Sequence, residues 1–225
     1  MSEIPVGNKF RVIIVGIGSG KAFHGMIDDL DRAVEELLKR ELAPGLVEQV
    51  GISFAAPDSD FPPSSVTLPA VDLFLYDIRE NLELRNTGWT IEHRDDGTAV
   101  RKKNPVRVDC SYLITAWASE GSTTRALDEH RLLSEVMKVL LKHPTIPEVL
   151  LQGSLKGQEP PLPSSTLQPG RLQSVSEFWQ ALGGKPKAAL NYTVTIGVVP
   201  DVAQETERPV IDKSIKVRPE MEFEQ

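Results

Sequence analysis

Val106-Arg-Val-Asp-Cys-Ser-Tyr-Leu-Ile-Thr-Ala-Trp117 is the stretch of sequence that decides the fold. One face of this run is apolar at every second residue, at Val106, Val108, Cys110, Tyr112 and Ile114. A period of two is typical of a β-strand, and β-branched and aromatic residues favour that conformation. We therefore expect a long strand here, with Cys110 buried as a small hydrophobic residue rather than acting as a nucleophile.

A second long strand is predicted before it, from Val71 to Arg85. Its second face changes from apolar to polar along the run, so the first half should be buried on both sides and the second half on one. Other apolar runs predict strands at residues 10–17, 50–54 and 190–199. The last of these should face the core with Leu190, Tyr192, Val194, Ile196 and Val198.

Two long helices are predicted from apolar residues that recur three and four positions apart. One runs from Met26 to Leu42, and the other runs over residues 124–142 and ends before Pro144. The core-facing stripe of the second helix should comprise Leu127, Leu133, Met137, Leu140 and Leu141. A short third helix should follow a capping box that Ser174 and Glu177 form.

The segment between the two long strands, Trp89 to Lys103, predicts a β-hairpin. Asp96-Gly97 at its middle suits a two-residue turn that requires positive φ. Because most of the hairpin is charged, we expect it to project into solvent or toward a partner. Asp96, Gly97 and Arg101 are therefore candidate partner-binding residues.

Two further segments lie outside the helices and strands predicted for the core. Pro144 to Gly170 is rich in proline and lacks periodicity, and loops of that length are usually functional or disordered. Arg208 to Arg218 reads as a lone strand after a polar linker, and a lone strand leaves its backbone groups unpaired unless a sheet edge receives it. It either connects to another chain or folds back onto its own sheet. Its candidate partner-binding residues are Val210, Ile211, Ile215 and Val217.

Together these elements predict an α+β fold: a mixed, largely antiparallel sheet covered by two long helices, with extended N- and C-terminal arms. The 225 residues are enough for one sizeable core. The predicted divisions are an N-terminal arm at 1–25, the α+β domain at 26–200, and a C-terminal linker and strand arm at 201–225.

Composition limits the partners and the location. The formal net charge is −7 and the isoelectric point is near 5.2, which disfavours nucleic acid or an anionic membrane as the principal partner. A single cysteine excludes an internal disulfide and a multi-cysteine metal site. The longest apolar run near the start, Val12 to Val15, is too short to insert into a membrane. We expect a protein that is cytoplasmic when it is made.

No group of residues predicts an active site. Gly16 to Lys21 resembles a phosphate loop, but Val15 and Ala22 occupy positions where such a loop needs glycine and a hydroxyl. A flexible turn is the favoured reading, and nucleotide binding is the alternative. Three aspartates at the start of the first helix, Asp28, Asp29 and Asp31, are explained by the helix dipole. The histidines lack metal-ligand spacing, so we expect no catalytic residue, cofactor or metal.

Five stretches carry a more specific signal when they are taken in order. They are Met26–Leu38, Pro69–Leu82, Val106–Trp117, Asp128–Met137 and Ser176–Leu182. They resemble the tail-terminator, or cap, proteins of phage-tail-like contractile injection systems, from roughly Met26 to Val199. Residues 1–25 precede the part that carries the resemblance.

The resemblance implies a structural protein and not an enzyme. Such a protein forms a ring, expected to be a homohexamer, that closes the distal end of the inner tube and of the contractile sheath. Its implied partners are its own copies, the sheath protein and the inner tube protein, and the lone C-terminal strand would add to a sheath sheet. The finished particle either associates with a membrane or is released. A non-terminator adaptor of the same particle is the alternative role.

Overall fold

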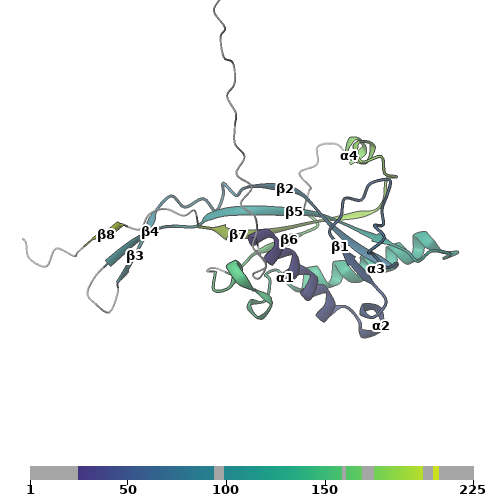
Figure 1. Cartoon of the computed structure of the whole chain (residues 1–225), viewed down its shortest axis with the longest axis horizontal. Coiled ribbons are helices and arrows are strands. Elements are labelled where there is room, and N and C mark those ends of the chain that lie inside the picture. Colours follow the sequence, from purple (N-terminus) through teal and green to yellow (C-terminus); the bar gives the residue numbers. More distant parts are fainter. Residues whose placement is uncertain (1–24, 94–98, 159–160, 169–174, 200–204, 208–225) are drawn as a thin grey trace, which may run out of the picture.

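The computed structural model describes residues 25–93, 99–158, 161–168, 175–199 and 205–207. A five-stranded sheet forms its centre (Figure 1). In order across the sheet, its strands are β1 (Gly51–Ser53), β2 (Ala70–Glu80), β5 (Val106–Trp117), β7 (Ala189–Val198) and β6 (Ser164–Thr166). β1 runs parallel to β2 and every other pairing is antiparallel, which confirms the predicted mixed, largely antiparallel sheet.

Helices lie on both sides of this sheet. The two long ones, α1 (Met26–Glu41) and α3 (Arg125–Lys142), cover one face, and the short α4 (Val175–Ala181) lies over one end of the other (Figure 1). Short helical turns complete the body: α2 (Pro44–Val47), η1 (Glu148–Leu150) and η2 (Gly153–Leu155). The predicted α+β class with two long covering helices is therefore confirmed.

A second, three-stranded sheet extends away from the body at the other end of the molecule (Figure 1). It consists of β3 (Trp89–His93), β4 (Ala99–Lys103) and β8 (Glu205–Glu207). We call these three strands the ribbon. The predicted hairpin is thus present, although its turn at residues 94–98 lies outside the described residues.

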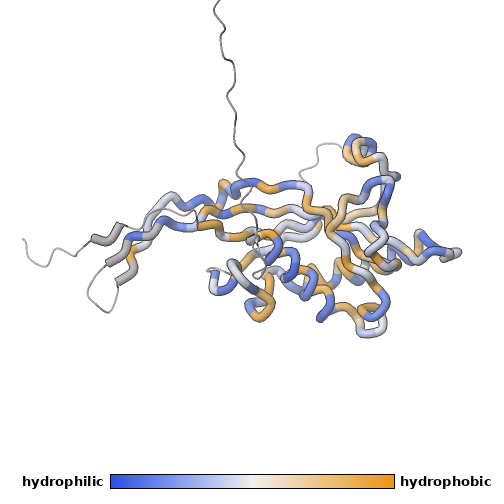
Figure 2. The backbone as a smooth tube through the Cα atoms, in the orientation of Figure 1, coloured by the Kyte–Doolittle hydropathy of each residue, from blue (hydrophilic) through white to orange (hydrophobic). Residues whose placement is uncertain are grey.

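The main core lies between the sheet and the two long helices. Tyr112 and Ile114 of β5 and Leu30 and Leu37 of α1 are all almost fully buried there. Figure 2 shows hydrophobic residues recurring along α1, β2 and β5. Cys110 is buried in the same core, and burial raises the pKa of its thiol to about 12, so it is the predicted hydrophobic residue and not a nucleophile.

The inward face of α3 differs from the predicted one. Its buried residues are Leu132, Leu133, Val136, Val139 and Leu140. Leu127 and Leu141, which were predicted to face the core, are 56% and 52% exposed. The observed stripe follows spacings of three and four residues around Val136. At about 100° per residue, Leu141 lies about 140° and Leu127 about 180° around the helix from Val136.

The second long strand is shorter than predicted, because β2 ends at Glu80 rather than Arg85. Asn81 explains the stop. Its backbone N–H still donates to Arg107 O, but its side-chain Oδ1 accepts from the N–H of Leu84 at 2.9 Å, which turns the chain. Asparagine commonly forms such local side-chain hydrogen bonds in turns.

Within residues 144–158 and 161–168, the proline-rich segment contributes to the core, so this part of the predicted loop is ordered. Four of its leucines are buried, namely Leu150, Leu151, Leu155 and Leu162. Its β6 pairs with β7. The burial has no regular period because the segment turns through η1 and η2, so its leucines point inward at irregular intervals.

Asp29 connects this segment to α1. The Asp29 carboxylate is buried and accepts hydrogen bonds from Ser154 N at 2.9 Å and Ser154 Oγ at 2.8 Å. Gly153 adopts φ +52°, and an added Cβ there would lie 2.3 Å from Asp29 Oδ2. Asp31 also bonds to the body, through Tyr112 Oη at 2.7 Å. The helix dipole alone therefore does not account for these acids.

A smaller aromatic cluster lies beneath α4 on the other face of the sheet. Phe178 of α4 packs 6.1 Å from Phe74, and Trp179 is 1% exposed. Strand alternation places Asp72 on this side. Neither of its buried carboxyl oxygens has a hydrogen-bond partner within the described residues. Burial raises the Asp72 pKa to about 7, against a smaller lowering effect of nearby Ser53.

One residue of β7 that β6 does not cover, Gly197, is capped by a side chain. Gln158 Oε1 accepts from Gly197 N at 2.8 Å, and Gln158 Nε2 donates to Gly197 O at 2.9 Å. The pairing of β6 with β7 stops at Val194, so Gly197 lies beyond it. There the Gln158 amide takes the place of a neighbouring strand, because it bonds to both the N–H and the C=O of Gly197.

Candidate assembly surfaces

The ribbon presents exposed apolar and cationic side chains on one face. Cross-strand pairing sets Trp89 opposite Lys103 and Ile91 opposite Arg101. Trp89 is 45% exposed and Ile91 is 60% exposed. The Arg101 guanidinium lies over the Trp89 ring, 4.5 Å from its centroid, which is a cation–π contact. Opposed residues of an antiparallel pair share one face, so these four side chains form a continuous strip.

The C-terminal part of the chain returns to this ribbon. β8 pairs with β4 in a register that sets Ala99 opposite Glu207 and Arg101 opposite Glu205. These residues lie in what the sequence suggested was a polar linker, so their strand was missed. A three-residue stretch of glutamate and threonine shows no pattern that would predict a strand. Strand β8 becomes visible only through its pairing with β4. The last eighteen residues therefore start from the ribbon and not from the body.

Of the predicted partner-binding residues, the structure places Arg101, in β4 beside Trp89. Asp96 and Gly97 lie between β3 and β4, outside the described residues, as do Val210, Ile211, Ile215 and Val217. The glycine-rich turn at 16–21 is also outside them. The roles of these residues stay predictions. Trp89, Ile91 and Lys103 were missed as site residues, although the aromatic and apolar residues alternating with charge in Trp89 to Lys103 carried the signal.

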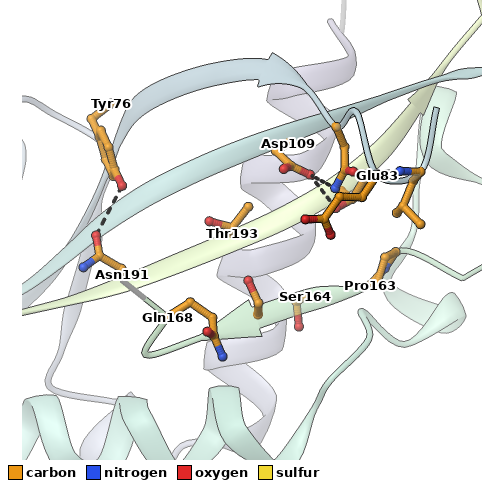
Figure 3. Close-up of a pocket in the computed structure, with 12 residues that line it drawn as sticks. Tyr76, Glu83, Asp109, Pro163, Ser164, Gln168, Asn191 and Thr193 are labelled. Carbon is orange, nitrogen blue, oxygen red and sulfur yellow. Dashed lines mark hydrogen bonds between the residues drawn. The ribbon is translucent and has the colours of Figure 1, made fainter. Parts of the chain in front are cut away.

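A polar groove of about 650 Å³ lies on the sheet face that faces away from α1 and α3 (Figure 3). Tyr76 Oη donates to Asn191 Oδ1 at 3.2 Å across it. Asp109 Oδ1 accepts from Thr195 Oγ1 at 2.7 Å and from Asn81 Nδ2 at 3.0 Å (Figure 3). Because these groups satisfy one another, the groove is a hydrogen-bonded polar surface rather than a set of groups poised for acid–base chemistry.

The opposite edge of the sheet is partly open. β1 pairs with β2 only over Ala70 to Asp72, and on that side no strand of the described residues pairs with the rest of β2. A bulge between Leu75 and Asp77 and the ion pair of Arg79 with Asp77 interrupt this edge. Bulges and charged side chains of this kind discourage unspecific strand addition.

The described part of the chain contains neither a metal-ion cluster nor a membrane-spanning helix. It holds no group of three or more histidine, cysteine, aspartate and glutamate side chains arranged to bind a metal ion. Its helices also fall short of the length and hydrophobicity that crossing a bilayer requires.

Two solved structures are similar to this chain. One is the sheath/tube terminator, in the extended state, of the extracellular contractile injection system PVC: it is 27% identical, with a TM-score of 0.64, and the match covers 89% of this chain and 66% of that chain. The other is the anti-feeding prophage cap, described as the AFP tube terminating cap: it is 26% identical, with a TM-score of 0.59, and the match covers 87% and 62%. This chain thus spans slightly less than two thirds of either relative.

A comparison with curated proteins finds no match. A family model described as the Pvc16 N-terminal domain matches residues 29–213, which include most of α1, the whole main sheet and the ribbon. The predicted resemblance to tail-terminator proteins of contractile injection systems is confirmed by this match and by the two structures. The chain therefore belongs to the Pvc16 N-terminal domain family.

Proposed function

We propose that this protein is the tail terminator of a contractile injection particle. As a ring it closes the distal end of the inner tube and the last layer of the sheath, and it works without turnover. The observation that carries the proposal is its similarity, over 89% of the chain, to a sheath/tube terminator. We expect the ring to have six copies, as the resemblance to tail-terminator proteins implies.

The ribbon supports a role in docking. A narrow sheet with exposed Trp89 and Ile91 has little core of its own, because two- and three-stranded ribbons without a packed layer are marginally stable in water. Aromatic and arginine side chains are also enriched where interfaces gain most of their binding energy. The strip of Trp89, Ile91, Arg101 and Lys103 therefore binds the sheath or tube protein in the assembled particle.

The C-terminal arm supplies the second contact. It leaves the ribbon at Glu207, and its sequence from Val210 to Val217 has the alternation of a strand. A strand that adds to the edge of a partner sheet gains backbone hydrogen bonds and fixes a register. The arm adds to a sheath sheet in this way.

Deleting Pro209 to Gln225, which leaves β8 in place, tests the arm. Electron microscopy of particles from cells with this deletion should show sheaths that are over-long, ragged or uncapped. A sharper variant changes Ile211, Ile215 and Val217 to asparagine, and its matched control changes Asp212, Ser214 and Lys216, on the opposite face, to alanine. Uniform, normally capped particles from the deletion would refute docking through the arm.

The ribbon has its own test. Trp89→Ala with Ile91→Ser should weaken capture of purified sheath or tube protein by about tenfold or more, since buried aromatic anchors contribute about 2 kcal/mol or more to an interface. Thr90→Ala is the control because Thr90 lies between these residues and bonds to Asn104. Equal capture by all three proteins would remove the ribbon from the docking surface.

Three outcomes would replace the terminator role. Native mass spectrometry should give a hexamer, and a stable monomer at particle-forming concentrations would contradict a ring. Particles of normal length and normal end structure after deletion of the whole gene would favour a non-terminator adaptor. An ATP affinity that Lys21→Ala abolishes would favour the nucleotide-binding alternative.

A further inference from the structure

A second pocket, of about 400 Å³, lies at the end of the body remote from the ribbon. It is bounded by the last residue of β5, the first turn of α3 and the loop between α4 and β7. Its charged lining residues are Arg125, Glu129, Lys185 and Lys187, and Trp117 and Ser59 line it as well. The ribbon joins β5 at Val106 and the pocket lies at Trp117, so the full length of that strand separates them.

The pocket carries an excess of positive charge. Glu129 Oε1 lies 2.9 Å from Lys187 Nζ and 3.9 Å from Arg125 Nε, so two cations share this carboxylate. Lys185 adds a third cation to the lining. Three positive groups against one negative group leave a formal charge of about +2 in a chain whose net charge is −7.

The floor of the pocket is aromatic. Lys187 Nζ lies 3.7 Å from the centroid of the Trp117 ring, and Phe61 packs against the same ring at 4.3 Å between centroids. Burial lowers the pKa of Lys187, and its contact with Glu129 opposes that shift. A ligand that brings carboxylates beside aromatic or other apolar groups suits this combination of a cationic wall and an aromatic floor.

The chain contains a segment with that chemistry. Residues 220–224 read Glu-Met-Glu-Phe-Glu, in which three acids alternate with two large apolar residues. They lie beyond the predicted strand at Val210 to Val217, so their use does not depend on strand addition. The charge and the apolar residues of this segment therefore complement those of the pocket.

The length of the C-terminal tail favours binding to the pocket of a neighbouring copy over binding to the pocket of its own copy. Glu207 pairs with Ala99 in the ribbon, and the 18 residues from Ala99 to Trp117, mostly extended strand, span about 55–60 Å. The 15 residues from Glu207 to Glu222 span about 50–54 Å at full extension. The tail would have to be straight and fully stretched to approach its own pocket, whereas a neighbour's pocket imposes no such condition.

We propose that the pocket around Lys185 and Lys187 binds the acidic segment Glu220 to Glu224 of a neighbouring copy. The tail at one end of each copy then meets the pocket at the other end of the next. Such a head-to-tail contact uses two different surfaces, and it closes into a ring when the rotation between copies divides a full turn.

Disulfide trapping in the purified full-length protein tests this contact. Ser59→Cys with Gln225→Cys places one thiol in the pocket and one next to the acidic segment while every charge is retained. Oxidation should give a ladder of covalent dimers and larger species on a non-reducing gel. Cys110 does not compete because it is buried, its thiol pKa is raised to about 12, and the thiolate is the reactive form.

Two controls isolate the pocket. Ser134→Cys with Gln225→Cys puts the thiol on the exposed surface of α3 away from the pocket and should give little ladder. Adding Lys185→Glu to the Ser59→Cys protein should lower the ladder yield about fivefold or more, as expected for reversal of one charge in a partly exposed site. A free peptide of residues 218–225 should compete, and the same peptide with glutamine at its three glutamates should not.

Three results would overturn the proposal. They are equal ladders from the Ser59 and Ser134 proteins, a ladder that Lys185→Glu does not change, and trapping only within single chains, which would assign the tail to its own pocket. The trapping experiment uses no sheath or tube protein. A negative result would therefore not count against the terminator role. If the terminator role were refuted, the contact between tail and pocket could still be tested in the same way.

Discussion

The body and the ribbon of this molecule are built from the same kind of element but in opposite surroundings. Strand β5 is buried along most of its length beneath α1 and α3. The ribbon continues from β2 and β5 into solvent, where Trp89 and Ile91 are about half exposed. Hydrophobic side chains therefore stabilise the fold in the body, whereas those of the ribbon stay exposed, as the proposed association requires.

This difference separates the effects of mutations. A buried apolar side chain contributes through area removed from water and through packing, so its truncation should unfold the protein more readily. An exposed apolar side chain contributes little to folding, so its truncation should affect only a partner. Four measurements test this difference, and they follow in order of expected effect on stability.

The largest effect should come from a pair of adjacent leucines in α3. Leu140 is fully buried and Leu141 is 52% exposed. Leu140→Ala should lower the free energy of unfolding by about 2–5 kcal/mol, because it leaves a cavity. Leu141→Ala should change it by about 0.5 kcal/mol or less. Denaturant titration of both variants measures the difference, and equal losses would refute the observed rotation of α3.

The second effect concerns two glycines with positive φ. Gly153→Ala should cost about 2–4 kcal/mol, since a left-handed alanine costs about 1–2 kcal/mol and its Cβ would meet the Asp29 carboxylate at 2.3 Å. Gly121 has φ +83° but nothing within 4 Å of an added Cβ, so Gly121→Ala should cost only about 1 kcal/mol. Thermal or denaturant unfolding that ranks the two equally would mean that Asp29 does not constrain this turn.

The third effect depends on pH through Asp72. Its pKa is raised from 3.8 to about 7 in the folded protein. At a pH between these two values, folding therefore takes up a proton. The stability that the neutral carboxyl contributes is lost as the pH rises from about 4 to 7. Asp72→Asn removes this loss, because asparagine does not titrate. The free energy of unfolding of the variant should exceed that of the unmodified protein by on the order of 2 kcal/mol at pH 8 and by little at pH 4. A pH-independent difference in unfolding free energy would contradict burial of a titrating Asp72.

The smallest effect should come from the ribbon. Ile91→Ser removes an apolar side chain that is 60% exposed and should change the free energy of unfolding by about 0.5 kcal/mol or less. The same variant should weaken capture of the partner protein. A loss of stability comparable to that of Leu140→Ala would show that the ribbon packs against the body and is not free for association.

The parts of the fold that have strong periodicity were predictable. β5, α1 and the inward face of β7 agree with the prediction, because their apolar residues repeat at every second residue or every three to four. The position of α3 in the sequence was also predicted, but not its rotation. Leu132 and Leu133 are adjacent, and periodicity alone does not decide which neighbouring leucine defines the face.

What was missed depends on contacts between distant residues. β6 is three residues long and exists because β7 pairs with it, and β8 exists because β4 pairs with it. Short segments of this kind lack a pattern that sequence reading detects. The strip on the ribbon is a different case, because the hairpin was predicted but the cross-strand pairing that sets Arg101 beside Trp89 depends on its exact register.

The amide of Gln158 has a consequence for growth. A β-sheet edge is a template, and each strand that joins it presents the same template again, which is how fibrils propagate. With both backbone groups of Gly197 occupied by a side chain, the β7 edge offers an incoming strand no donor or acceptor at that position. One glutamine side chain therefore stops templating at this residue of β7, where a further strand would otherwise occupy the same two backbone groups.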